Sequence, residues 1–237
     1  MARGPTVLAR RFRDDGRGVS IVEFAIVFPI LLMLMLGGIQ VITYVNATRK
    51  VELVAQSISQ MISQAVPPQG STIATVNATD LHFSFDAALV LFPYVMKDAQ
   101  RQGLLWWQDI LINYTSVAFS QKSAGCTNSA DMSACYNANV VWTSTGTYGG
   151  NKRLCSTPLQ PADNTAAPST GTLPRSVYGP GSLIVIDVVF TFKPTFGAKF
   201  FPASQIARSV YVQPRYADLI NYDTTNNDGI GSKCPGY

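Results

Sequence analysis

The fold is decided by residues 18–45, which have the sequence GVSIVEFAIVFPILLMLMLGGIQVITYV. Between Val19 and Ile39 this stretch contains a single charged residue, Glu23. As an α-helix, Val19–Ile39 would be about 31 Å long, which matches the ~30 Å hydrocarbon core of a bilayer. A core helix of a soluble domain rarely has this length without polar residues. We therefore predict a helix that crosses a membrane once.

The charges around this helix predict its orientation. Residues 1–18 carry five Arg residues against Asp14 and Asp15, and no comparable basic cluster closely follows the apolar stretch. Basic residues flanking a membrane span favour the cytoplasmic side. We expect a basic cytoplasmic leader over residues 1–18, a transmembrane and stalk helix over residues 19–65, and a translocated domain over residues 66–237.

Two other interpretations of this stretch stay open. A secretory signal peptide also has a basic start and an apolar centre, and Val45-Asn46-Ala47 could serve as its small-residue cleavage site. The apolar run is, however, longer than the usual signal-peptide core, and Val45 lies well beyond its end. A plain membrane anchor with no further function is the second alternative, and Glu23 is the residue that argues against it.

Glu23 lies near the start of the apolar run. An ionised carboxylate is unfavourable by up to about 3 kcal/mol at mid-membrane, so an acid in such a segment is expected to have a partner. If the chain were cut after Gly18, Val19 would carry a cationic α-amine. Glu23 would then be able to pair with an amine, most usefully that of a neighbouring subunit, and both charges would be neutralised inside a bundle of apolar helices.

These residues resemble the processing site of type IV pilin-like proteins. Gly18-Val19-Ser20-Ile21-Val22-Glu23-Phe24 follows basic residues and precedes an apolar helix. In that family a prepilin peptidase cuts after the glycine, and a glutamate occupies the fifth mature position. The aromatic Phe24 is similar to the tight-adherence (Tad, Flp-type) branch, and VEFAIVFPILLMLMLGGIQ resembles the TadE/TadG-like minor pilins or pseudopilins. Pro29 fits that group and is expected to kink the helix, because its ring removes one backbone hydrogen bond.

The resemblance implies a function in pilus assembly and surface adhesion. It implies a minor pilin or pseudopilin of a Tad-type pilus, anchored in the bacterial inner membrane with a cytoplasmic N-terminus and a periplasmic C-terminal domain, and able to enter an extracellular pilus. Gly18 and Val19 would flank the cleavage site, and Glu23 with Phe24 would form the intersubunit charge contact. The implied partners are membrane lipid, other pilins or pseudopilins, the Tad assembly machinery and the prepilin peptidase. The alternative is an uncleaved membrane-anchored periplasmic binding or adhesin-like domain.

A helical repeat continues past the membrane. Apolar residues recur there with alternating spacings of three and four: Tyr44, Ala47, Val51, Val54, Ile58, Met61 and Ala65. This spacing is typical of a helix that packs on another helix or on a sheet. Pro67-Pro68 is expected to end the helix, because proline cannot continue the hydrogen-bond ladder. A polar linker is expected from Pro67 to Val76.

The remaining residues predict an α+β domain. Thr79 is a candidate N-cap, with Asp80 in the first turn of a short amphipathic helix that ends before Pro93. Four stretches rich in β-branched and aromatic residues predict strands: 109–119, 139–143, 183–192 and 207–215. Because no helical crossovers separate them, we expect an antiparallel sheet of about four strands with the long N-terminal helix packed on it, as in pilins. Asp187 is expected to face solvent or a partner, and the long loop 144–182 to be functional or mobile.

The four cysteines lie after the membrane helix. An even number of cysteines in an oxidising compartment indicates two disulfides. Three connectivities are possible, and we favour Cys126–Cys135 together with Cys155–Cys234. Zinc is disfavoured because the chain has no CxxC pair and only one histidine, His82.

The sequence offers little that indicates an enzyme. We expect no catalytic residues, no metal and no cofactor, because no phosphate loop, nucleophile elbow or zinc-binding HExxH motif is present. Asp187 and Asp218 could form the carboxylate pair of a hydrolase, but their spacing gives no sign that they are close. Asp223–Gly229 lacks the register of a calcium loop and predicts a turn. Outside the leader the charges nearly balance, which argues against nucleic-acid binding.

Overall fold

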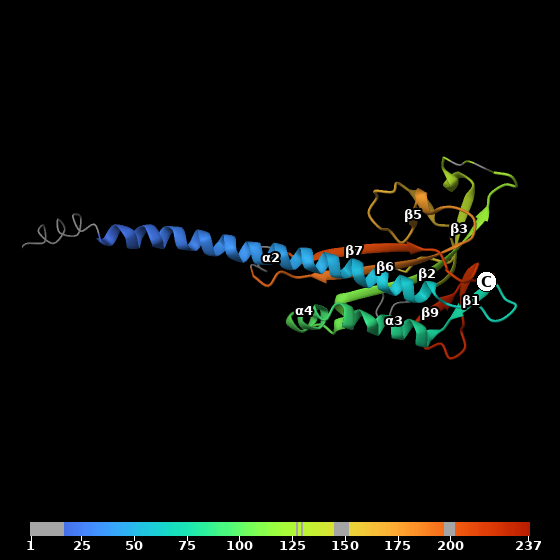
Figure 1. The fold of residues 1–237 in the computed structure, drawn as a ribbon, viewed down its shortest axis with the longest axis horizontal. Coiled ribbons are helices and arrows are strands. Elements are labelled where there is room, and N and C mark those ends of the chain that lie inside the picture. The colour runs from blue at the N-terminus through green and yellow to red at the C-terminus, as the bar shows by residue number, and fades with distance from the viewer. Residues whose placement is uncertain (1–16, 127, 129, 145–151, 197–201) are drawn as a thin grey trace, which may run out of the picture.

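The structure is a computed structural model that describes residues 17–126, 128, 130–144, 152–196 and 202–237. Over these residues one long helix, α2 (Arg17–Ser63), projects from a folded α+β domain (Figure 1). The leader expected over residues 1–18 lies outside the described residues except at its last two positions. The α+β class is confirmed, and the main sheet has five described strands instead of about four.

The main sheet is antiparallel and has the strand order β7-β6-β2-β3-β9. Its strands are β2 (Ile110–Gln121), β3 (Tyr136–Ser144), β6 (Ser182–Phe192), β7 (Ser204–Val212) and β9 (Gly231–Lys233). The first four correspond to the four predicted strands, whose β-branched and aromatic side chains suit a pleated surface. β9 is not predicted, because three residues with a glycine at the start give no alternating pattern.

Two small parallel sheets also differ from the prediction. β1 (Ile73–Val76) pairs with β8 (Leu219–Tyr222), so the expected polar linker ends in a strand. Within the expected loop 144–182, β4 (Gln160–Ala162) pairs with β5 (Thr172–Pro174). That loop is therefore partly ordered by backbone pairing, and residues 145–151 of it lie outside the described residues.

Three further α-helices follow β1, where one was expected. They are α3 (Ala78–Leu91), α4 (Tyr94–Gln102) and α5 (Trp106–Asp109), and two short 3-10 helices, η1 (Met132–Ala134) and η2 (Arg175–Val177), come later. The N-cap of α3 is Asn77, not Thr79: its side chain accepts from the Asp80 N–H, and the Asp80 carboxylate accepts from the Asn77 N–H. This reciprocal pair satisfies two backbone donors that would otherwise lack partners.

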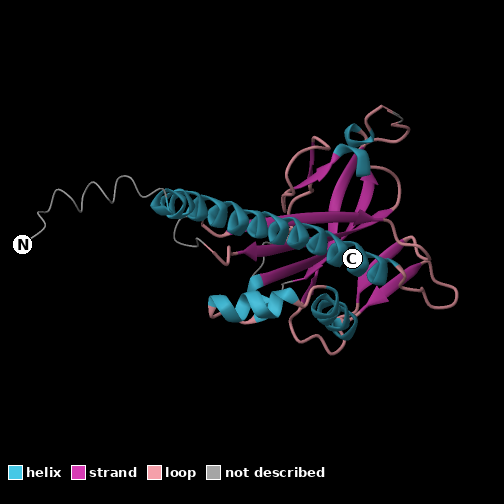
Figure 2. Cartoon of the chain, turned by 60° about the vertical axis from the view of Figure 1, so that its left-hand side comes forward, coloured by secondary structure: helices cyan, strands magenta, loops and turns pink. Residues whose placement is uncertain are grey.

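The C-terminal half of α2 packs along one face of the main sheet and against α3 (Figure 2). Ala47, Val51, Val54 and Ile58 of the predicted seam are buried. Tyr44 and Met61 are more exposed than the seam predicts, at 40% and 39%, and Ile62 is buried in place of Met61. Ala65, the last residue of the seam, packs against the core. The helix drifts relative to a strict 3-4 repeat because it has 3.6 residues per turn.

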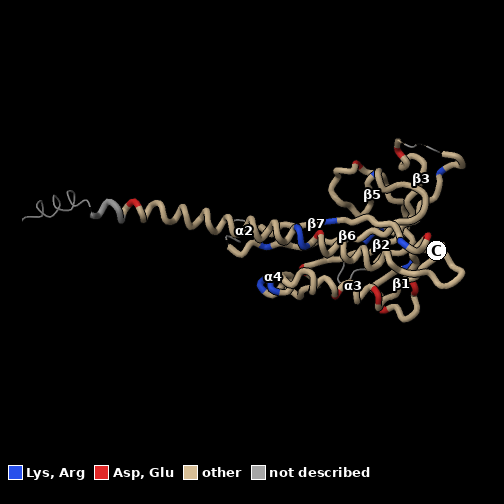
Figure 3. The backbone as a smooth tube through the Cα atoms, viewed as in Figure 1, with Lys and Arg blue, Asp and Glu red and all other residues tan. Residues whose placement is uncertain are grey.

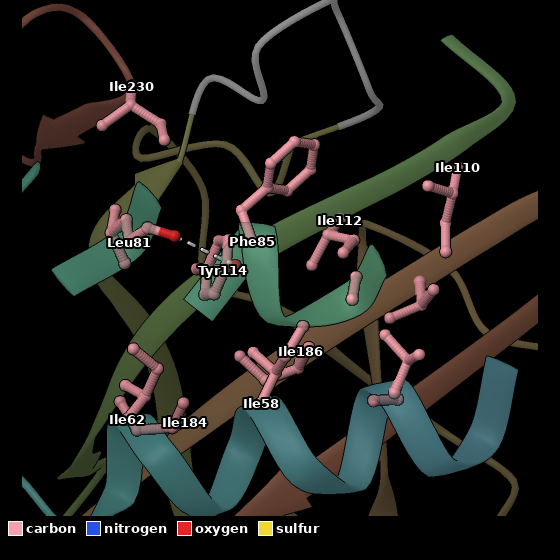
Figure 4. Packing of buried hydrophobic residues seen from close by; sticks show 14 of the residues in the cluster. Ile58, Ile62, Leu81, Phe85, Ile110, Ile112, Tyr114, Ile184, Ile186 and Ile230 are labelled. Atoms are coloured by element: carbon pink, nitrogen blue, oxygen red, sulfur yellow. Dashed lines mark hydrogen bonds between the residues drawn. The ribbon is translucent and has the colours of Figure 1, made fainter. Parts of the chain in front are cut away.

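The two faces of the sheet bury separate clusters. On the α2 face, Ile184 and Ile186 of β6 meet Ile58 of α2, with Leu81 and Phe85 of α3 beside them (Figure 4). On the opposite face, a second cluster lies under the loops that carry β4 and β5, and includes Leu183 and Val185 of β6. Successive side chains of one strand therefore supply both cores, which explains why β6 is apolar almost throughout.

Candidate membrane and assembly interface

The N-terminal half of α2 extends away from the described part of the domain (Figure 1). Its large apolar side chains are exposed, and these include Val22, Phe24, Ile26, Val27, Phe28, Ile30, Leu31, Leu32, Met33, Leu34, Met35, Ile39, Val41 and Ile42. By length and composition the helix is able to cross a membrane. A continuous apolar surface of this extent is costly in water and indicates a surface that lipid or other helices cover.

Glu23 lies on this exposed helix, near its N-terminal end (Figure 3). Among the described residues no side chain forms a hydrogen bond or ion pair with its carboxylate. The next charged residues along the helix are Arg49 and Lys50, more than 25 positions further on, which at 1.5 Å per residue is roughly 40 Å away. A cation that neutralises Glu23 within a bilayer therefore has to come from the start of the chain or from another molecule.

Phe24 and Pro29 belong to the same part of the helix. The rings of Phe24 and Phe28 stack with centroids 5.3 Å apart, and Phe24 is 65% exposed. The helix continues through Pro29, whose ring nitrogen cannot donate to the carbonyl of Ala25 one turn earlier. Whether the helix bends there stays a prediction.

Gly18 and Val19 lie in the first turn of α2. The expected cleavage site, Glu23 and Phe24 thus lie within seven consecutive residues at the N-terminal end of α2.

The contact between α2 and the domain begins near residue 40. The Gln40 side-chain oxygen accepts from the Thr195 N–H (3.3 Å), and the Tyr44 ring meets Phe192 edge-on at 5.4 Å. Ala47 is the first buried residue of the helix. Beside it, a cavity of about 780 Å³ opens between α2 and the α3–α4 junction. The end of the apolar run and the start of the domain therefore coincide.

The four cysteines lie on the domain, away from the exposed helix. Cys126 pairs with Cys135, and Cys155 pairs with Cys234, which is the connectivity that the sequence analysis favours. The second bond joins residues 79 positions apart. It links the segment 152–181, which carries β4 and β5 and is called the β4–β5 loop below, to the C-terminal segment. Closing so long a loop restricts the unfolded chain and stabilises the fold by several kcal/mol, roughly 4 in the chain-entropy estimate.

Within the described part of the chain, no group of three or more His, Cys, Asp or Glu side chains could hold a metal ion. His82 lies on α3, and its Nε2 is 2.5 Å from Asp228 Oδ2 at the surface. In the expected turn 223–229, Asp223 accepts from the Thr225 N–H and Asn227 from the Gly229 N–H. The turn is thus held by its own backbone amides.

Of the two expectations for Asp187, solvent or a partner, the structure shows a partner. Asp187 is 8% exposed and forms a two-pronged ion pair with Arg153: Nε to Oδ2 is 3.0 Å and Nη2 to Oδ1 is 3.1 Å. Arg153 is itself 0% exposed and also donates to the Thr172 carbonyl (2.7 Å), while Ser209 donates to Asp187. The partner of this acid is therefore internal, and the pair attaches the β4–β5 loop to the sheet.

The sequence analysis also missed a buried acidic cluster at the end of α4. Asp98 and Asp109 are 1% and 0% exposed, and Gln102 Nε2 donates to both, at 2.8 and 3.1 Å. Arg101 pairs with Asp98, but the Oδ2 atom of Asp109 has no hydrogen-bond partner among the described residues. Burial and the nearby Asp98 carboxylate raise the pKa of Asp109 to about 7. The sequence analysis predicts a strand that starts at Asp109, and no feature of the sequence there indicates that the carboxylate is buried.

This cluster predicts stability that falls as the pH rises. The folded-state pKa of Asp109 lies above the unfolded value of 3.8, so its contribution is fully present below pH 3.8 and is lost as the pH rises through about 7. Between pH 5 and pH 8 the loss from this one group is roughly 2–3 kcal/mol. Asp109→Asn should remove most of that slope in chemical denaturation of the full chain in micelles.

The control for this prediction is Asp163→Asn, which changes an exposed aspartate. That variant should keep the wild-type dependence of unfolding free energy on pH. An Asp109→Asn variant with an unchanged slope would show that Asp109 is ionised in the folded protein at pH 5.

Comparison with known proteins agrees with this geometry. Residues 18–58 match the family model described as TadE-like protein. The match starts at the expected cleavage site and covers the exposed half of α2 and much of its packed half. No curated protein and no solved structure matches the chain. The family match and the exposed apolar helix together indicate a membrane-anchored, single-pass protein related to the Tad pilus.

Proposed function

We propose that this TadE-like protein is a minor pilin or pseudopilin of a Tad-type pilus. Its α2 helix is anchored in the bacterial inner membrane with the N-terminus in the cytoplasm, and the α+β domain of residues 66–237 lies in the periplasm. The helix then takes part in pilus assembly by packing against the helices of other subunits. The proposed role is structural: the surface of α2 contacts lipid and other subunits, and the protein catalyses no reaction.

One observation carries this proposal. The segment that matches the TadE-like family includes the half of α2 whose apolar side chains are exposed. An anchor needs an apolar surface for lipid, and a subunit of a helical fibre needs the same surface for its neighbours. One half of α2 is exposed and the other half is packed on its own domain. Such a helix can move from the bilayer into the fibre without refolding.

The two disulfides support the location of the domain. Both lie after the membrane helix in the chain, and bonds of this kind persist in the oxidising periplasm but are rare in the cytoplasm. The excess of arginine before the helix supports the same orientation.

Processing after Gly18 is the step that tests the proposal. In cells that contain the matching prepilin peptidase, intact-mass spectrometry should find a chain that starts at Val19. Gly18→Val should block the cut and leave nearly all of the protein with its leader. Gly16→Val changes a glycine two positions earlier and should be processed normally.

An intact leader in the wild-type protein would contradict the pseudopilin assignment. It would favour the alternative, an uncleaved periplasmic binding or adhesin-like domain that keeps α2 as a plain anchor. A cut after Ala47 would instead identify a secretory signal peptide and would remove the membrane anchor from the mature protein.

A further inference from the structure

Several backbone positions of Lys and Arg lie where α2 enters the domain (Figure 3). They come from three segments that are far apart in the sequence. We call the set the basic foot, and it consists of Arg49 and Lys50 on α2, Lys97 and Arg101 on α4, and Lys193 after β6. Lys50 and Lys97 are exposed, and their ammonium groups form no hydrogen bond or ion pair with another described residue.

Contacts fix the basic foot at the level where the apolar run ends. Thr195, two residues after Lys193, donates its N–H to Gln40, and Arg101 donates to the Lys193 carbonyl. Arg49 and Lys50 line the cavity between α2 and the start of α4. If α2 spans a bilayer from about Val19 to Ile39, these three segments lie in the headgroup layer or just outside it.

The buried Asp98 offsets the charge of Arg101, but the other four cations of the basic foot form no ion pair with a described acid. Asp98 and Asp109 are buried beneath the basic foot, and Glu52 is the exposed acid nearest to it on α2. The exposed acids Asp80 and Asp223 lie near the C-terminal end of α2 and β1: Asp80 borders a cavity with Met61 and Val76, and the Asp223 N–H donates to the Val76 carbonyl. The domain is therefore electrically polarised along the axis of α2.

Exposed apolar side chains accompany the basic ones. Met96 on α4 is 54% exposed, Leu105 before α5 is 52% exposed, and Phe196 after β6 is 46% exposed. Basic and large apolar side chains mixed on one surface are typical of segments that lie in a membrane interface. The position of this surface at the level of the lipid headgroups favours lipid as its binding partner.

We propose that the basic foot rests on the bilayer surface and binds the phosphates of anionic phospholipids. This inference depends on the membrane anchoring of the proposed function, but not on pilus assembly or on the orientation of the chain. Lys50 and Lys97 contact the headgroups, while Met96, Leu105 and Phe196 enter the boundary with the acyl chains. The contact holds the domain upright on the membrane around α2 and opposes removal of the subunit from the bilayer.

The test uses the full chain reconstituted into vesicles. Single fluorescent labels are attached through Leu34→Cys in the helix, Met96→Cys at the basic foot and Thr225→Cys at the far end. Nitroxide-bearing lipids then quench the labels that lie close to lipid. In vesicles of phosphatidylcholine with phosphatidylglycerol we expect quenching at positions 34 and 96 but not at 225.

Charge is tested in the same vesicles with a matched pair of variants. Lys50→Gln with Lys97→Gln should shift the docking equilibrium by roughly tenfold or more and lower the quenching at position 96, as should high salt. Lys122→Gln with Lys152→Gln removes two charges elsewhere on the domain and should change nothing.

The outcomes separate this inference from the proposed function. Quenching at position 34 without quenching at 96 would overturn the lipid contact and leave the anchor intact. Equal quenching at 96 in pure phosphatidylcholine would refute the recognition of anionic lipid. No quenching at position 34 would overturn the membrane anchor, and the lipid contact with it.

Discussion

Replacing Glu23 with alanine is expected to reduce pilus formation about tenfold or more while leaving the protein in the membrane. The substitution makes α2 more apolar, so insertion should be at least as good as in the wild type. What it removes is the carboxylate that, in the proposed fibre, pairs with the α-amine of Val19 from a neighbouring subunit. Loss of one member of a charge pair in apolar surroundings leaves the other charge without a partner, at a cost of about 3–5 kcal/mol.

The structure supports this prediction through the isolation of Glu23. No described side chain reaches its carboxylate, and the residues around it are exposed apolar side chains. A glutamate that stayed solvated at the surface would contribute little to the free energy of subunit assembly. Inside a bundle of apolar helices the same carboxylate becomes the strongest determinant of register, because only one axial placement brings an amine next to it.

The measurement compares pilus yield and membrane content for a set of variants. Glu23→Gln should reduce pilus yield almost as much as Glu23→Ala, because it removes the charge. It keeps the shape and the hydrogen-bonding capacity of the side chain. Glu52→Ala is the matched control, since it removes an exposed acid from the same helix beyond the apolar run. Normal pilus yield with Glu23→Ala would refute the charge pairing, whatever the state of the leader.

The elements with strong periodicity were predictable, and those defined by distant contacts were not. The apolar run of α2 and the β-branched stretches of β2, β3, β6 and β7 determine their structure locally. β1 and β8 are short strands that exist because each supplies the other's backbone partners, across more than 140 residues of sequence. A single sequence carries no signal for such a pairing.

The same reasoning explains the errors at individual residues. Asn77 and Thr79 are both good N-caps, and the choice depends on which one has an acid three positions later; Asp80 satisfies that condition for Asn77. Asp109 follows two tryptophans and precedes an apolar strand, yet it is buried because α4 folds back over it. Asp187 was expected to face solvent or a partner, and the sequence did not identify that partner because Arg153 lies 34 positions earlier in an irregular segment.

Arg153→Ala is expected to destabilise the domain by about 3–5 kcal/mol. Arg153 and Asp187 are buried, and the guanidinium donates to both carboxylate oxygens and to the Thr172 carbonyl. Truncation leaves the Asp187 carboxylate under the β4–β5 loop with only the Ser209 hydroxyl as a described side-chain donor. Chemical denaturation of the full chain in micelles, with disulfides intact and tryptophan fluorescence as the signal, measures the loss.

Two further variants distinguish a buried charge from a lost contact. Arg175→Ala breaks the ion pair with Asp131, in which both side chains are partly exposed, and should have a much smaller effect. Arg153→Met combined with Asp187→Val removes both charges and should recover most of the stability, because no ion remains desolvated. If Arg153→Ala proves as mild as Arg175→Ala, water reaches Asp187. The loop would then be held to the sheet by the Cys155–Cys234 bond and its apolar contacts instead.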